Sequence, residues 1–160
     1  YNPNAVARIP TEPLMVEDLY LVGAAGNGDP GDTVSFAAVC QRDLILPSKG
    51  FGLRDWVQNT AREKEHIIDV AFEIHSVPMT CDLVESGLGC TILPYAVVQQ
   101  AVQSGRLFAS QIVRPRVPRT LYFAYAASHI DNNASRAVRG LIDTLIGESI
   151  AESDGRLRAP

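Results

Sequence analysis

The chain has 160 residues, of which 46% are hydrophobic and 20% charged, and its formal net charge is −4. These proportions exclude a disordered chain, and the negative charge excludes a general attraction of this chain to nucleic acid. No run approaches the ~18 apolar residues of a membrane span, and no signal-peptide pattern is present.

The first third of the chain predicts few regular elements. Residues 1–13 contain three prolines, which favours an extended connection over a helix. Residues 19–22 predict the first strand, and residues 23–32 form a Gly/Asp/Pro loop that must lie at the surface. Residues 33–43 favour a short helix, with Phe36, Val39 and Cys40 as its apolar residues.

The pattern becomes regular from Leu44. Residues 44–46 predict a buried strand, and a loop then opens a helix whose apolar face is Leu53, Trp56, Val57 and Ala61. Residues 69–75 predict a second strand in which Val70, Phe72 and Ile74 alternate with Ala71, Glu73 and His75, the more solvent-exposed face. Ser76 can cap the next helix, with Pro78 in its first turn.

Residues 82–100 then hold a helix end, a strand and a new helix with almost no loop. Gly87 can adopt the positive φ that ends the first helix, and residues 90–93 have the length of a buried strand. Pro94 fits the first turn of the next helix, whose apolar face is Val97, Val98, Ala101 and Val102. This density of connections is typical of a parallel α/β sheet.

The last third predicts strands at 107–113 and 121–127, separated by the basic, proline-containing segment 114–119, an exposed crossing or hinge. Residues 134–146 form the cleanest amphipathic helix, which Asp131, Asn132 or Asn133 could cap. The tail after this helix has no apolar face and is expected to fray.

Together these elements predict one complete α/β lobe, residues 39–113, with right-handed crossovers. The flanking residues, 1–38 and 114–160, predict part of a second lobe whose first strands and helix would precede Tyr1. A lobe inserted in another through two crossing strands leaves a cleft between the two.

Known catalytic and metal-binding motifs are missing from the sequence, so neither an enzyme nor a metal or cofactor site is expected. The three cysteines lie among apolar residues at no metal-ligand spacing, as reduced core cysteines do. Gly87-Leu88-Gly89 precedes a strand instead of following one, which suits helix termination better than dinucleotide binding. His66 and His129 are interpreted as surface or capping residues, and Thr91 as a packed strand residue.

Two loops are the candidate ligand site, because each follows the carboxyl end of a strand and opens a helix. The first contains Pro47, Ser48 and Lys49, and the second contains His75, Ser76 and Pro78. Helix-end amides, the two serine hydroxyls and the lysine suit an anion, and the loops should be adjacent on one rim of the sheet. The alternative is that Ser48 and Ser76 only cap helices.

The sequence resembles the effector-binding domain of LysR-type transcriptional regulators. The residues that carry the resemblance are EDLYLV, LILPSKGFGLRDWV, EIHSVPMTCDLVESGLGCTILPYAVV and GRLFASQIVRPRVPRTLYFAYA, in that order and followed by an apolar helix. They cover the chain to about residue 150. Within them, the sequences PSKGFG and EDLYLV are most similar to those of nitrogen-assimilation and aromatic-acid regulators.

This resemblance implies a two-lobed fold of the periplasmic-binding-protein type (type II), with a largely parallel sheet in each lobe. It implies that a small effector binds in the cleft between the two lobes of one domain, and we expect this effector to be a carboxylate or other anion. It also implies that the full protein is cytoplasmic and forms a homodimer or tetramer. Pro47, Ser48, Lys49, His75, Ser76 and Pro78 match the family's ligand loops in the second lobe. DNA would be bound only by an N-terminal domain that this chain, expected to be a fragment, does not contain.

Two alternatives share this fold. A periplasmic solute-binding protein would need a signal peptide and two complete lobes, and the unpaired cysteines count against it. A prephenate dehydratase-like enzyme would need a threonine-rich active-site motif, and the sequence contains none.

Overall fold

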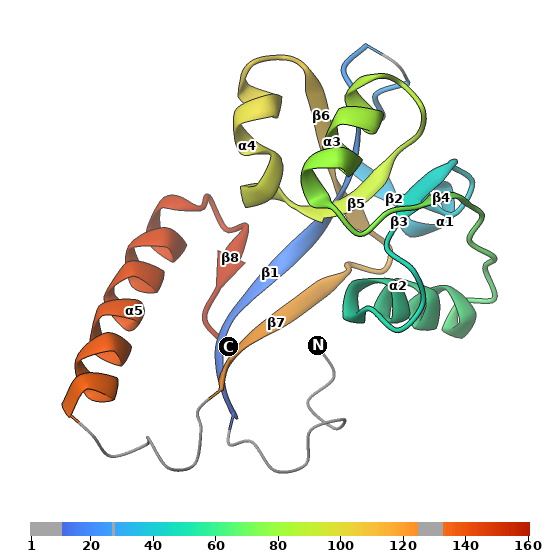
Figure 1. Cartoon of the computed structure of the whole chain (residues 1–160). Coiled ribbons are helices and arrows are strands. Elements are labelled where there is room, and N and C mark those ends of the chain that lie inside the picture. Colours follow the sequence, from blue (N-terminus) through green and yellow to red (C-terminus); the bar gives the residue numbers. More distant parts are fainter. Residues whose placement is uncertain (1–10, 27, 125–132) are drawn as a thin grey trace. The chain divides into compact units, whose positions relative to one another are not determined.

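The computed structural model describes residues 11–26, 28–124 and 133–160 (Figure 1). The described chain divides into two compact units. The first unit is Asp18–Val117, and the second contains the residues before Asp18 and after Val117. The lobe boundaries predicted from the sequence, 39–113 within 1–38 and 114–160, stay a prediction.

The first unit is built on a mixed sheet. The strand β1 (Thr11–Ala24) lies between β5 (Thr91–Pro94) and β6 (Leu107–Val113) and is antiparallel to both. The short strand β2 (Thr33–Ser35) extends the sheet beyond β6 and is parallel to it.

Two further strands, β3 (Leu44–Leu46) and β4 (Val70–Glu73), pair parallel to each other. A parallel bridge between Leu44 and Cys90 joins them to the main sheet. There the Ile45 amide donates to the Cys90 carbonyl at 2.8 Å, and the Cys90 amide donates to the Asp43 carbonyl at 2.9 Å. The order is therefore β4-β3-β5-β1-β6-β2, and β1 alone runs against the other five.

Both faces of this sheet are buried, as the alternation along β1 shows. Leu19 and Leu21 belong to one core cluster, which also contains Phe36 of α1 (Phe36–Val39) and Val57 of α2 (Gly52–Glu63). Tyr20 and Val22 belong to a second cluster on the other face. That cluster contains residues of α3 (Val77–Glu85) and α4 (Tyr95–Gln103). The unit is thus a three-layer α/β structure, as the helix and strand alternation predicted.

Several predicted details of the first unit are confirmed. Of the short helix predicted at residues 33–43, residues 36–39 form α1, with Phe36 and Val39 fully buried, whereas residues 33–35 form the strand β2. Gly87 has φ of 79° directly after α3, and the Leu88 amide donates to the Leu83 carbonyl at 3.1 Å, which is a helix C-terminal closure.

Other details were wrong. Phe72 is 46% exposed, because β4 pairs with β3 at the end of the strand order. Val97 is 47% exposed, so the buried face of α4 is narrower than predicted. Pro94 is the last residue of β5 and the N-cap of α4, not a residue of its first turn. Val117 is fully buried in the supposedly exposed crossing.

The second unit contains the first part of β1, β7 (Pro118–Ala124), α5 (Asn133–Glu152) and β8 (Leu157–Arg158). The expectation of a frayed tail was wrong, because β8 pairs with β1 at Val16 and Glu17. The predicted strand at 121–127 lies in β7 as far as residue 124. The cap candidates Asp131 and Asn132 and strand residues 125–127 lie outside the described residues.

The helix α5 buries none of its residues, although its sequence is amphipathic. Val138, Leu141 and Leu145 are 54%, 61% and 52% exposed. Within the described ranges, no helix is long and apolar enough to cross a membrane.

Candidate ligand-binding site

The two predicted ligand loops are in contact at one rim of the first unit. The Ile74 amide at the end of β4 donates to the Leu46 carbonyl at the end of β3, at 3.0 Å. The rings of Phe51 and His75 stack at 4.5 Å between centroids, tilted by 47°. The predicted adjacency of the loops is therefore present, and the ring pair links the start of α2 to the loop that opens α3.

The first loop leaves the start of α2 without a side-chain cap. Phe51 is the N-cap residue, and no side chain accepts a hydrogen bond there. The backbone of Ser48 accepts from the Phe51 amide at 3.4 Å, whereas the Ser48 hydroxyl makes no hydrogen bond within the described ranges. The capping alternative is therefore wrong for Ser48, and its hydroxyl can take a ligand hydrogen bond.

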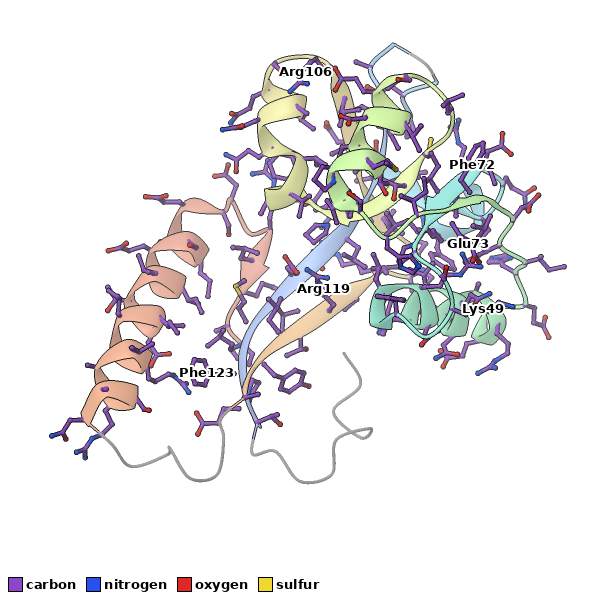
Figure 2. The ribbon with its side chains drawn as sticks, in the orientation of Figure 1. Lys49, Phe72, Glu73, Arg106, Arg119 and Phe123 are labelled. Atoms are coloured by element: carbon purple, nitrogen blue, oxygen red, sulfur yellow. The ribbon has the colours of Figure 1, made fainter. Side chains whose placement is uncertain are left out.

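Charges of both signs flank this loop. The Asp55 carboxylate accepts from the Gly50 amide at 3.0 Å and already interacts favourably with the start of α2. Lys49, labelled in Figure 2, is an exposed residue of this loop. The loop therefore contains an unbonded hydroxyl and an exposed lysine, while the Asp55 carboxylate is already hydrogen-bonded to the backbone.

The second loop is capped. The Ser76 hydroxyl accepts from the Met79 amide at 3.4 Å, and Pro78 lies in the first turn of α3. The capping alternative thus describes Ser76 correctly, and a ligand would have to share this hydroxyl with the helix. His75 is exposed apart from its contact with Phe51.

The rim also has an apolar part. Phe51, Val77 and Met79 are all exposed large hydrophobic residues of the two loops. Grouped apolar side chains next to a few polar groups are typical of sites for small organic molecules.

Arg54 was missed by the sequence analysis. It is the third residue of α2, only 3% exposed, and its Nε and Nη1 atoms are buried without a hydrogen-bond partner among the residues that the structure describes. An unsatisfied buried charged donor costs roughly 1–3 kcal/mol or more. The sequence did carry a signal for it, because Arg54 is spaced three and seven residues before the apolar Val57 and Ala61.

The remaining candidate residues have structural roles. Thr91 is buried, and its hydroxyl donates to the Ile45 carbonyl at 2.7 Å, linking β5 to β3. The His66 ring packs 6.4 Å from the Phe36 ring, and His129 lies outside the described residues. Among the residues that the structure describes, no three His, Cys, Asp or Glu side chains are grouped to hold a metal ion.

All three cysteines are free thiols whose pKa lies above the ordinary value. Burial is the main cause in each case, and Asp82 and Glu85 raise the pKa of Cys81 further. The thiols are therefore protonated at neutral pH and poorly suited to nucleophilic chemistry.

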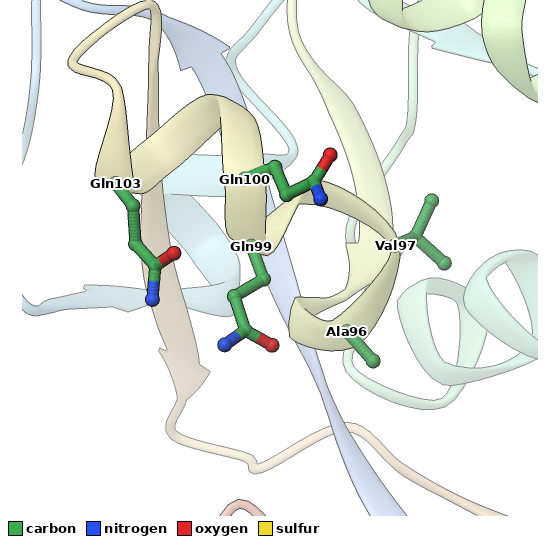
Figure 3. A pocket seen from close by; sticks show the side chains of 5 residues that line it. All are labelled: Ala96, Val97, Gln99, Gln100 and Gln103. Atoms are coloured by element: carbon green, nitrogen blue, oxygen red, sulfur yellow. The ribbon is translucent and has the colours of Figure 1, made fainter.

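A separate depression of about 390 Å³ lies on α4, away from the predicted residues (Figure 3). It is lined by Ala96, Val97, Gln99, Gln100 and Gln103. This site offers amide groups and no charge, so it lacks the features that favour an anion.

Residues 1–147 match the sequence profile of the LysR substrate binding domain. The chain belongs to the LysR substrate-binding domain family. This membership favours a regulator over the solute-binding protein and the dehydratase-like enzyme.

Among curated relatives of this LysR domain, the nitrogen assimilation regulatory protein of Klebsiella aerogenes is 26% identical over 153 residues. That alignment covers 96% of the chain and 50% of the relative. The chain thus spans about half the length of the curated relatives it matches.

Solved structures show the same fold. The effector binding domain of QuiR in complex with shikimate has a TM-score of 0.74 and 20% identity, and covers 91% of the chain and 68% of that domain. The CcmR regulatory domain of Synechocystis PCC6803 in complex with 2-PG has a TM-score of 0.71 and 17% identity. The match covers 86% of this chain and 66% of that domain. The LysR domain therefore has the two-lobed, periplasmic-binding-protein-like α/β fold that the sequence predicted.

Proposed function

We propose that this LysR domain senses a small anionic metabolite, which binds at the loops formed by residues 47–51 and 75–79. The observation that carries the proposal is the contact of these loops at one rim. There the uncapped start of α2 lies beside the Ser48 hydroxyl, Lys49 and the Phe51–His75 ring pair.

The physical basis is the positive end of α2. Its first-turn amides have no side-chain acceptor among the described residues, and the helix dipole favours a negative group there. Lys49 adds a positive charge outside the same loop, and Phe51, Val77 and Met79 offer contact for an apolar ligand body. The solved relatives named with shikimate and 2-PG support small-molecule binding in this fold.

The wider role follows from the family. We propose that the domain belongs to a cytoplasmic transcriptional regulator that acts as a homodimer or tetramer and performs no catalysis. In this proposal DNA is contacted by a separate N-terminal domain, and effector binding in the present domain changes its activity. The acidic net charge of this chain agrees with that division of labour.

Calorimetric titration tests the ligand class. A panel of small carboxylates, including shikimate and benzoate, is titrated against the 160-residue chain, with the neutral amides of the same acids as controls. We expect at least one acid to bind and its amide to bind more weakly, because the amide lacks the negative charge that the positive end of α2 favours.

Two substitutions test the location. Ser48→Ala removes a hydroxyl that makes no hydrogen bond, so we expect the fold to be unchanged and acid binding to weaken by roughly fivefold to tenfold. Ser104→Ala, at the exposed end of α4, is the matched control and should bind as the unaltered chain does. Equal affinity of all three proteins would refute the site.

A further inference from the structure

Among the buried charged side chains of the described residues, Arg54 differs from the other two, Glu17 and Asp18, because it has no ion-pair or hydrogen-bond partner for its Nε and Nη1. Glu17 is paired with Arg119, and Asp18 accepts from the Gln111 side-chain amide at 2.8 Å and lies 3.6 Å from an Arg116 nitrogen. Arg54 is 3% exposed, yet its Nε and Nη1 have no hydrogen-bond partner in the described part of the chain. A guanidinium cannot escape this cost by losing its proton, so its N–H groups need an acceptor, and an oxyanion makes the strongest hydrogen bonds to them.

The position of Arg54 on α2 indicates where such a partner would bind. Side chains on a helix lean toward its N-terminus, so the head group of a third residue lies at the first turn. Arg54 shares the inner face of α2 with Val57 and Ala61, which belong to the core cluster. Its guanidinium therefore lies on the inner side of the uncapped helix start.

Neighbouring residues do not supply the missing partner. Asp55, the nearest carboxylate along the chain, accepts from the Gly50 amide and makes no ion pair with Arg54. The Ser48 hydroxyl, just before the same helix start, also has no hydrogen-bond partner among the described residues. The start of α2 thus has three kinds of donor without an acceptor among the described residues: first-turn amides, the Ser48 hydroxyl and the buried Arg54 guanidinium.

We propose that Arg54 is the buried cationic partner of the oxyanion group, carboxylate or phosphate, of the small acid that this domain senses. The inference rests on the proposed function and adds the residue that would select an acid over a neutral molecule. The planar guanidinium can donate two parallel hydrogen bonds to one oxyanion, while Asp55 disfavours a second anionic group close by.

Nuclear magnetic resonance of the arginine Nε–H groups tests this assignment in the 160-residue chain. The Arg54 resonance is identified by its loss in Arg54→Lys. Sodium benzoate and sodium phosphate are then titrated separately against sodium chloride at equal ionic strength. We expect a saturable shift of the Arg54 Nε–H with at least one oxyanion, and the probe that gives it distinguishes carboxylate from phosphate.

Arg62 is the matched control, because it lies in the last turn of the same helix and is exposed. Its Nε–H should show no saturable shift. We expect Arg54→Met to weaken binding of the active oxyanion by about tenfold or more, and Arg62→Met to leave it unchanged. The absence of a saturable Arg54 shift with both oxyanions, or equal binding by Arg54→Met, would overturn the inference.

A stability measurement separates a ligand role from a structural one. Without oxyanion, Arg54→Met should unfold at the same or a higher urea concentration than the unaltered chain, because it removes an unpaired buried charge. A large fall in that midpoint would overturn the inference by showing that Arg54 supports the fold. If acids still bind with Ser48 dependence while Arg54→Met binds normally, only this inference fails. If no acid binds, the proposed function fails as well.

Discussion

Gly89 and Thr91 hold β5 against β3 by different means. Gly89 has φ of 153°, and a Cβ added there would lie 2.7 Å from the Asp43 carbonyl oxygen. Thr91 contributes a buried hydrogen bond to the Ile45 carbonyl. Because β3 carries the first ligand loop at its end, these two residues help to position the candidate site.

Replacement of Gly89 by alanine should destabilise the first unit strongly. We expect Gly89→Ala to lose about 2 kcal/mol or more, because the Cβ collides with rigid backbone. Gly105→Ala is the control, since Gly105 also has positive φ but open space around it, and should lose about 1 kcal/mol. Urea unfolding measures both, and similar losses would contradict the steric account.

The thiol of Cys81 should react slowly at neutral pH. Its pKa is raised by burial and then by Asp82 and Glu85, so the reactive thiolate is scarcer than in an unperturbed cysteine. We expect iodoacetamide to modify Cys81 more slowly than free cysteine at pH 7.5, with the rate rising as pH increases. Mass spectrometry of the labelled chain measures this, and rapid labelling at pH 7.5 would disprove the assignment.

At the scale of elements, the sequence predicts the helices and strands that have a clear apolar pattern, but it does not predict β2 and β8. β3 and β5 are uninterrupted buried runs, and α2, α3 and β6 repeat apolar residues on one face, so the sequence predicts all five. β2 (Thr-Val-Ser) and β8 (Leu-Arg) each contain a single apolar residue, and their partners lie far away in the chain. Phe72 was predicted to lie on the buried face, because alternation along a strand does not reveal that β4 ends the strand order.

The exposed apolar face of α5 should promote self-association of the chain or binding of other apolar molecules. Val138, Leu141 and Leu145 are each more than half exposed on one helix. We expect the chain to self-associate or to bind an apolar fluorescent dye, and Leu141→Gln with Leu145→Gln to reduce either effect. Light scattering and dye fluorescence measure this.

A paired substitution controls for the loss of any two exposed apolar residues. Leu88→Gln with Val97→Gln removes exposed apolar side chains from the first unit and should leave dye binding nearly unchanged. A monodisperse monomer that binds no dye would contradict the expectation for α5.

At the scale of the whole molecule, the fold class and family could be predicted because the motifs follow one another in order along most of the chain. The candidate site was only partly predictable. Strand-end loops identify Ser48 and His75, but the uncapped start of α2 and the isolation of Arg54 are properties of packing. An arginine on an apolar helix face was visible in the sequence, whereas its lack of a partner was not.

Amide chemical-shift mapping with the tightest-binding acid of the panel tests the central claim most directly. We expect the largest shifts at residues 48–54 and 75–79, and small shifts at the glutamine-lined depression of α4. Shifts concentrated at residues 96–103, with the two loops unchanged, would contradict the proposed site.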